Sequence, residues 1–168
     1  VSTTGQYKHT YATKGTYIVK MHGYINYGNY PHVSVANSLT EVIKMPYADY
    51  DFSRMFCNCL YLTKANMSNI RGSHGYMFVG SPIEEIICHN IVARGIYSLF
   101  TGCNKLKTIE GLNTWDTTSI TNASTLFNNC SLLTDITISN WDLNNATNLT
   151  NFVNNCSKLN SFKAPYNI

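Results

Sequence analysis

Apolar and polar positions along the chain repeat in one phrase, in which two apolar residues lead into a short turn and a small residue. The phrase ends at Cys or Ser and has five copies: residues 55–59 (MFCNC), 77–81 (MFVGS), 99–103 (LFTGC), 126–130 (LFNNC) and 152–156 (FVNNC). Its last position advances by 22, 22, 27 and 26 residues from copy to copy. Self-similarity at this period is typical of a solenoid, in which each unit packs against its neighbours.

Each phrase leads into a second apolar pattern, in which a Leu or Ile is followed three residues later by another inward residue. The pattern begins at Leu62, Ile83, Leu106, Leu133 and Leu159, and Leu39 opens one copy earlier. Alternation of β-branched residues, as at Ile136 and Ile138, predicts a strand too short to be stable alone. We therefore expect about six rungs whose strands align as a parallel sheet.

The segment before each phrase predicts a short helix. Apolar residues recur there at helical spacing, as in Ile120, Ala123 and Phe127. The residue before the Cys or Ser is always one of the two types that most readily adopt the left-handed conformation closing a helix; these are Asn58, Gly80, Gly102, Asn129 and Asn155. The predicted fold class is an α/β repeat, a short leucine-rich-repeat solenoid with short parallel strands and short helices.

The last positions of the phrases predict a buried ladder at the turn into each strand. Its members are Cys59, Ser81, Cys103, Cys130 and Cys156. Free cysteines behave as small buried hydrophobes, although neighbouring rungs are close enough for a Cys103–Cys130 or Cys130–Cys156 disulfide. A second ladder of turn-capping side chains is expected after the strands, formed by Asn69, Asn90, Asn113, Asn140 and Asn167.

Two stretches resemble known modules. The segment Leu99–Leu159, with its paired Trp115-Asp116 and Trp141-Asp142, resembles the BspA-type leucine-rich repeats of bacterial surface proteins and some anaerobic protists. The opening His9–Gly23 resembles the last hairpin of a PKD-like β-sandwich, and its alternation independently predicts two strands. We expect residues 1–35 to cap the solenoid or to be the remnant of a neighbouring domain, and residues 36–168 to form the solenoid.

Charge and residue chemistry narrow the function. The formal net charge of +3 comes from scattered Lys and Arg residues, which argues against nucleic acid as a partner. No apolar run is long enough for a membrane helix. The five histidines have no paired spacing, so no metal or other cofactor is expected. The adjacent Glu84 and Glu85 would point to opposite faces of a strand. We therefore expect a protein that is not an enzyme.

Two groups of residues are candidates for binding. The first follows the strands on the outward face and is either a binding stripe or a merely solvated face: Glu41, Lys64, Asn66, Glu85, Ile87, Thr108, Glu110, Asp135, Thr137, Ser161 and Lys163. The second is an aromatic cluster that either binds a partner or seals the first rung: Tyr24, Tyr27, Tyr30, Tyr47 and Tyr50.

The resemblance implies a surface-exposed or secreted adhesion module that recognises a protein or glycan on a host or neighbouring cell, as part of a larger polypeptide or assembly. Two alternatives stay open. One is a receptor-binding or decoration module of a phage tail or virion, because repeat and PKD-like modules also occur there. The other is an accessory fragment of a larger surface enzyme. Fold alone does not decide among these functions.

Overall fold

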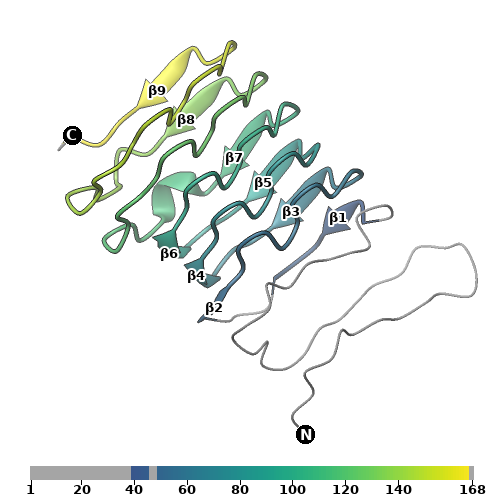
Figure 1. The fold of residues 1–168 in the computed structure, drawn as a ribbon, viewed down its shortest axis with the longest axis horizontal. Coiled ribbons are helices and arrows are strands. Elements are labelled where there is room, and N and C mark those ends of the chain that lie inside the picture. Colours follow the sequence, from purple (N-terminus) through teal and green to yellow (C-terminus); the bar gives the residue numbers. More distant parts are fainter. Residues whose placement is uncertain (1–38, 46–48, 167–168) are drawn as a thin grey trace, which may run out of the picture.

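The fold is a parallel β-solenoid of about five turns, seen in a computed structural model that describes residues 39–45 and 49–166 (Figure 1). Strands β1 (Glu41–Val42), β3 (Lys64–Asn66), β5 (Glu85–Ile87) and β7 (Thr108–Glu110) form one parallel sheet. Strands β8 (Asp135–Thr137) and β9 (Ser161–Lys163) form a second one along the same side. We call this side the main wall. Its six strands come from successive rungs and run parallel to one another. The predicted stacking of parallel rungs is therefore confirmed.

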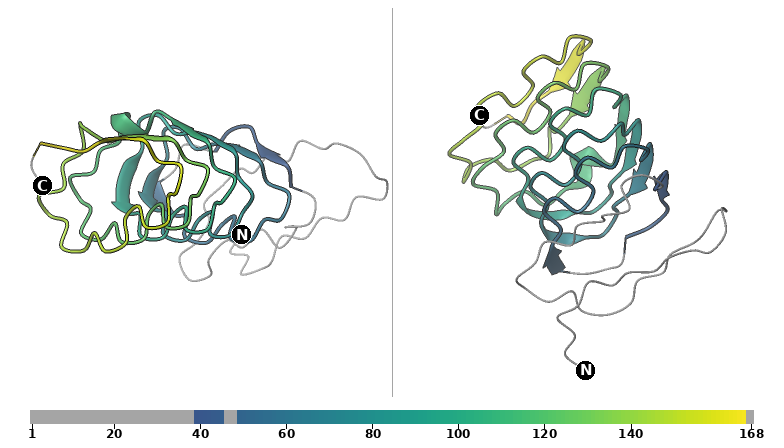
Figure 2. Two further views of the ribbon diagram at one scale, coloured as in Figure 1. Left: turned by 90° about the horizontal axis from the view of Figure 1, so that it is seen from above. Right: turned by 45° about the vertical axis from the view of Figure 1, so that its right-hand side comes forward.

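A shorter sheet lies on another side of the solenoid. It contains β2 (Asp49–Asp51), β4 (Arg71–Ser73) and β6 (Val92–Gly95), in that order and all parallel. Figure 2 shows the rungs stacked along one axis. The main wall follows this axis from β1 to β9, whereas the shorter sheet covers three rungs. Within each sheet, every strand pairs with its counterpart in the next rung, because a unit of this length cannot bury its own apolar face.

The predicted short helices are wrong. The described residues contain a single helical segment, the 3-10 turn η1 (Leu112–Thr114). Elsewhere each phrase is a chain of turns in which two residues four apart have positive φ, such as Arg54 at 63° and Asn58 at 56°. An α-helix requires negative φ at every residue and unbroken bonds to the carbonyl four residues earlier. The left-handed residues prevent both.

The backbone hydrogen bonds of the phrase alternate between the rung itself and the next rung. The Cys57 N–H donates to the carbonyl of Arg54 (3.1 Å), which is a turn bond, whereas the Phe56 N–H donates to the carbonyl of Met77 (2.9 Å) in the following rung. The predicted left-handed residues are confirmed, with φ of 69° at Gly80 and 63° at Asn129. They close turns, and the apolar spacing of three to four residues matches these turns as well as it matches a helix.

The core is built from columns of identical or similar side chains. Phe56, Phe78, Phe100 and Phe127 stack with ring centroids 5.4, 5.8 and 5.7 Å apart. Beside them Trp115 and Trp141 stack at 5.5 Å. Aromatic pairs at this separation stabilise beyond their buried area. The rungs are therefore held in register from inside.

The Cys/Ser ladder is confirmed. Its side chains lie at the turn into the strand. Four of them donate to the carbonyl of a phenylalanine one rung earlier: Ser81 Oγ to Phe56 at 2.6 Å, Cys103 Sγ to Phe78 at 3.1 Å, Cys130 Sγ to Phe100 at 3.2 Å and Cys156 Sγ to Phe127 at 3.0 Å. All six cysteines are free thiols. Burial raises the pKa of Cys103 and Cys130.

The expected Asn ladder is present in part. Asn90 Nδ2 donates to Asn69 Oδ1 at 3.5 Å, and the Asn140 N–H donates to Asn113 Oδ1 at 2.8 Å. Asn167 lies outside the described residues, as do residues 1–35 with the expected PKD-like hairpin. A further pair of ladders runs along the phrases, where Asn154 donates to Asn128 and Asn155 to Asn129.

Candidate binding face

The outward residues of the main wall form two columns. In the first column Glu41 pairs with Lys64, Lys64 with Glu85 and Glu85 with Thr108. In the second column Asn66 pairs with Ile87 and Ile87 with Glu110. On β8 and β9 the pairs are Asp135 with Ser161 and Thr137 with Lys163. Of the residues between them, Ala65, Ile86 and Ile136 are buried, Val42 and Ile109 are half-buried, and Phe162 on the last strand is exposed. The predicted stripe thus lies on one side of the solenoid, which we call the outer face.

Ion pairs set the charge pattern of the outer face. Lys64 Nζ lies 2.9 Å from Glu85 Oε2, and this hydrogen bond raises the pKa of Lys64. Lys107 Nζ lies 2.7 Å from Glu84 Oε2 and lowers the pKa of Glu84. His89 Nε2 lies 3.0 Å from Glu110 Oε1. Because solvent-exposed pairs contribute little stability, these residues define a surface pattern of charge more than they hold the fold together.

Apolar side chains interrupt this polar surface. Ile43, which follows β1, is 65% exposed, and Ile87 on β5 is 39% exposed. Exposed aliphatic residues beside charged ones are compatible with a protein-binding surface, which combines apolar contacts with a polar rim.

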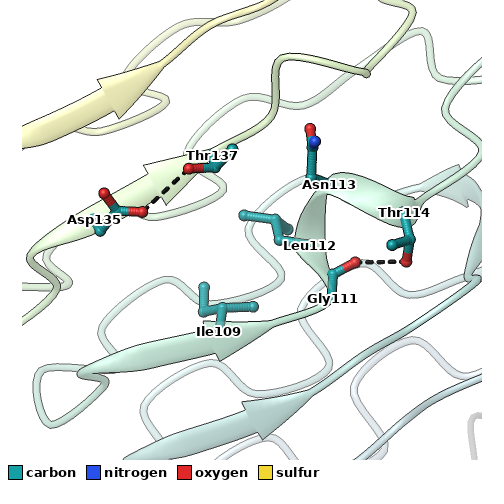
Figure 3. A pocket seen from close by; sticks show the side chains of 7 residues that line it. All are labelled: Ile109, Gly111, Leu112, Asn113, Thr114, Asp135 and Thr137. Atoms are coloured by element: carbon teal, nitrogen blue, oxygen red, sulfur yellow. Dashed lines mark hydrogen bonds between the residues drawn. The ribbon is translucent and has the colours of Figure 1, made fainter.

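The main wall is interrupted between β7 and β8, which do not pair with each other. A hollow of about 230 Å³ lies there (Figure 3), which we call the gap. Its lining residues are Ile109, Gly111, Leu112, Asn113, Thr114, Asp135 and Thr137. Ile109 is half-buried, whereas its counterparts Ile86 and Ile136 in neighbouring rungs are buried. The interruption therefore opens the wall to solvent.

The spacing of the core residues is longer by one residue beside the gap. Two residues separate Ile109 from the next core residue, Leu112, whereas one separates Ile136 from Ile138. The extra residue is Gly111, whose φ is 86°. A Cβ at Gly111 would lie 2.8 Å from atoms of His89, which is closer than real contacts allow. The left-handed conformation and the close approach both require glycine here.

The insertion splits only the main wall. The Phe100 and Phe127 rings still stack at 5.7 Å, and Trp141 Nε1 donates to the carbonyl of Leu112 at 2.8 Å. The rungs on both sides of the gap are therefore fixed by the core. Figure 3 shows Leu112 pointing from η1 toward β8, above Ile109.

Polar groups surround the gap. Asp135 Oδ1 accepts a hydrogen bond from Thr137 Oγ1 at 3.2 Å, and Asp135 forms no ion pair within residues 39–45 and 49–166. Thr114 Oγ1 donates to the carbonyl of Gly111 at 2.7 Å and accepts from the Asn90 N–H at 2.8 Å. The sequence places Asp135 and Thr137 on the outer face and Asn113 in the ladder of turn-capping residues, but it did not single out Gly111, Leu112 or Thr114. The longer spacing after Ile109 was the available signal.

The second sheet carries a separate charged cluster that the sequence did not reveal. Asp49 Oδ2 lies 3.0 Å from Arg94 Nη2 and 4.0 Å from Arg71 Nε. Arg54 lies over the ring of Tyr76, 4.7 Å from its centroid. These three are all the arginines of the chain.

The remaining candidate residues and site types have the following outcome. Tyr24, Tyr27, Tyr30 and Tyr47 of the aromatic cluster lie outside the described residues, and the backbone of Tyr50 lies in β2.

Within the part of the chain that the structure describes, no group of three or more His, Cys, Asp or Glu residues is placed to hold a metal ion. In that same part, no helix has the length and apolarity to span a membrane.

The fold and the outer face define a class, that of parallel β-solenoid repeat proteins with a patterned sheet surface. A family model described as a Mycoplasma protein of unknown function, DUF285, matches residues 94–168, which is less than half of the chain. This stretch includes β7, the gap, β8 and β9. No curated protein and no solved structure matches the chain.

Proposed function

We propose that the chain is a non-enzymatic binding module that recognises a protein or a glycan through the outer face. The observation that carries this proposal is the in-register arrangement of charged and apolar side chains, with Lys64 and Glu85 beside Ile87. A solenoid fixes the backbone beneath these side chains through its stacked core. A preorganised surface loses less conformational entropy on binding than a flexible one does.

We further propose that the module acts at the cell surface or as a secreted protein, in the manner of BspA-type leucine-rich repeats. The paired Trp-Asp positions that carry this resemblance support it. Trp115 and Trp141 occupy equivalent sites in successive rungs, where their Nε1 atoms donate to the carbonyls of Cys88 and Leu112 at 2.7 and 2.8 Å. The Trp-Asp pairs are thus part of the repeat itself.

Charge reversal on the outer face tests the proposal. The chain is applied to arrays of host proteins and glycans, and any ligand that it binds is measured again with Lys64→Glu, with Glu85→Lys and with both together. Each single reversal should weaken binding, since it changes the sign of one charge in the first column. Neither should greatly reduce stability, because both side chains are 53% exposed.

Two controls separate the outer face from net charge. Lys158→Glu makes the same charge change at an exposed turn residue away from the strands. The double exchange restores the Lys64–Glu85 ion pair with its direction reversed, so binding should stay weak if the ligand contacts these charges. Binding that survives both single reversals, or falls equally with Lys158→Glu, would exclude the outer face. Binding to nothing on either array would refute the proposal as a whole.

A further inference from the structure

We propose that the gap between β7 and β8 accepts a short extended peptide with basic side chains, which completes the main wall as an added strand. This deepens the proposed function and rests on it, because it names the chemistry of a partner at the outer face. Three features of the gap support the proposal: two unpaired strand edges, a shallow apolar floor and exposed carboxylates.

The first feature is backbone pairing. One edge of β7 is occupied, since the Cys88 N–H donates to the carbonyl of Glu110 at 2.8 Å and the Lys107 N–H to that of Glu84 at 3.0 Å. The far edge of β8 is also occupied, since the Ile138 N–H donates to the carbonyl of Lys163 at 2.9 Å. The edges that face each other across the gap have no ladder between them. An unpaired edge is a template for an added strand, and here two edges face the same space.

The second feature is the size and floor of the gap. Its volume of about 230 Å³ is below the roughly 300–1,000 Å³ of pockets that hold drug-sized ligands. β7 and β8 are each three residues long, which matches a segment of similar length. The floor is Ile109 and the buried Leu112, so an inward-facing residue of the peptide must be small and apolar.

The third feature is charge. Outward side chains of an added strand would lie between Thr108 and Asp135 in the first column and between Glu110 and Thr137 in the second, because alternate residues of a strand share a face. Asp135 has no ion-pair partner among the described residues, and Glu110 is 68% exposed beside His89. Lys or Arg at both outward positions complements these carboxylates. Lys163 lies next to Thr137 in the second column and repels a basic side chain there. The peptide residue beside Asp135 should therefore contribute more to binding than the residue beside Thr137.

Isotope-labelled full chain and synthetic peptides provide the test. The probe is acetyl-Thr-Lys-Val-Lys-Thr-amide, and the comparison peptides carry Glu in place of Lys or an N-methylated Val. NMR titration should shift the backbone amides of Ile109, Asp135 and Thr137, and hydrogen exchange at these amides should slow on binding. Both comparison peptides should bind weaker by about tenfold or more, because one loses the charge complementarity and the other a main-chain donor.

Three variants assign the effect to the gap. Deletion of Gly111 restores the spacing of the neighbouring rungs, so β7 should pair with β8 and peptide binding should be lost while Ile109 exchanges more slowly. Asp135→Asn keeps the gap open and should reduce the preference for Lys over Glu. Asp51→Asn removes one exposed carboxylate from β2 on the second sheet and should leave peptide binding unchanged. If the Gly111 deletion does not fold, Asp135→Asn still decides the role of charge.

Several outcomes would overturn the proposal. They are equal binding of the Lys and Glu peptides, unchanged binding by the N-methylated peptide, and shifts at the gap amides caused by monosaccharides but not by peptides. Failure of all peptides, together with array binding that Lys64→Glu abolishes, would refute a peptide site while leaving the outer face as a binding surface. The two proposals therefore fail in different ways.

Discussion

His74 should make the stability of this solenoid depend on pH between neutrality and about pH 4. Its side chain is 0% exposed, and neither ring nitrogen has a hydrogen-bond partner among the described residues. It occupies a core column, with the Phe52 ring 5.9 Å away and Ile96 at the equivalent position of the next rung. Burial lowers the pKa of His74 to about 4, with opposing contributions from the Ser73 backbone and the nearby Asp51 and Asp49.

The sign and size of this pH dependence of stability follow from proton linkage. The unfolded chain, with a His pKa of 6.5, binds a proton that the folded chain excludes until the pH approaches 4. The stability associated with neutral His74 is therefore complete above pH 6.5 and is lost as the pH falls toward 4. At pH 4.5 the loss should be about 2–3 kcal/mol, and at full protonation about 3 kcal/mol.

Urea unfolding at pH 7.5 and 4.5 measures this loss, with His74→Phe as the perturbation. Phe fits the column, because Phe52 occupies the same position one rung earlier, and it cannot be protonated. The difference in unfolding free energy between the two pH values should be smaller in His74→Phe than in the native chain by about 2–3 kcal/mol. His89→Gln, at a 40% exposed histidine, is the control and should keep the native pH dependence. Parallel pH profiles for the native chain and His74→Phe would refute the argument.

Three other substitutions or modifications have definite expectations. Phe100→Ala removes a ring stacked on both sides and should lower the unfolding free energy by about 3–5 kcal/mol in chemical denaturation. Gly111→Ala forces a Cβ against His89 at positive φ and should cost about 1–3 kcal/mol, whereas a neutral effect would argue against the close packing there. Thiol titration should give six free thiols in denaturant. In the native chain at pH 8 only Cys57 and Cys156 should react readily, since the other four cysteines are buried.

The sequence predicts the period and the inward residues better than it predicts the local conformation. Asn58 and Gly80 were identified as left-handed positions from residue type alone, because few residues tolerate positive φ. Ile120 and Ala123 were identified as inward and are buried. The helical conformation predicted between such positions was wrong, because the spacing that marks a helical stripe also fits a chain of turns. What decides between them is where the N–H groups bond, and that depends on the neighbouring rung.

The buried histidine was missed for a related reason. His74 stands three residues before Met77, where the other copies of the phrase have Phe52, Ile96, Ala123 and Leu149. Aligning the copies would have placed it in the core. Residue type alone predicts a surface position, since histidine is usually at least partly exposed. Position within the repeat is therefore a better guide to burial in this chain than residue type is.

The gap shows how a repeat protein can acquire a site without losing its core. A solenoid rung is held by its neighbours on every side, so an insertion is tolerated wherever the remaining contacts suffice. The Phe100–Phe127 and Trp115–Trp141 stacks provide those contacts here, and in the main wall only β7 and β8 are neighbours that do not pair. The same insertion in a rung without such stacks would weaken the whole column. For this reason, departures from the regular spacing next to unbroken core columns are the positions in such repeats where binding sites are to be sought.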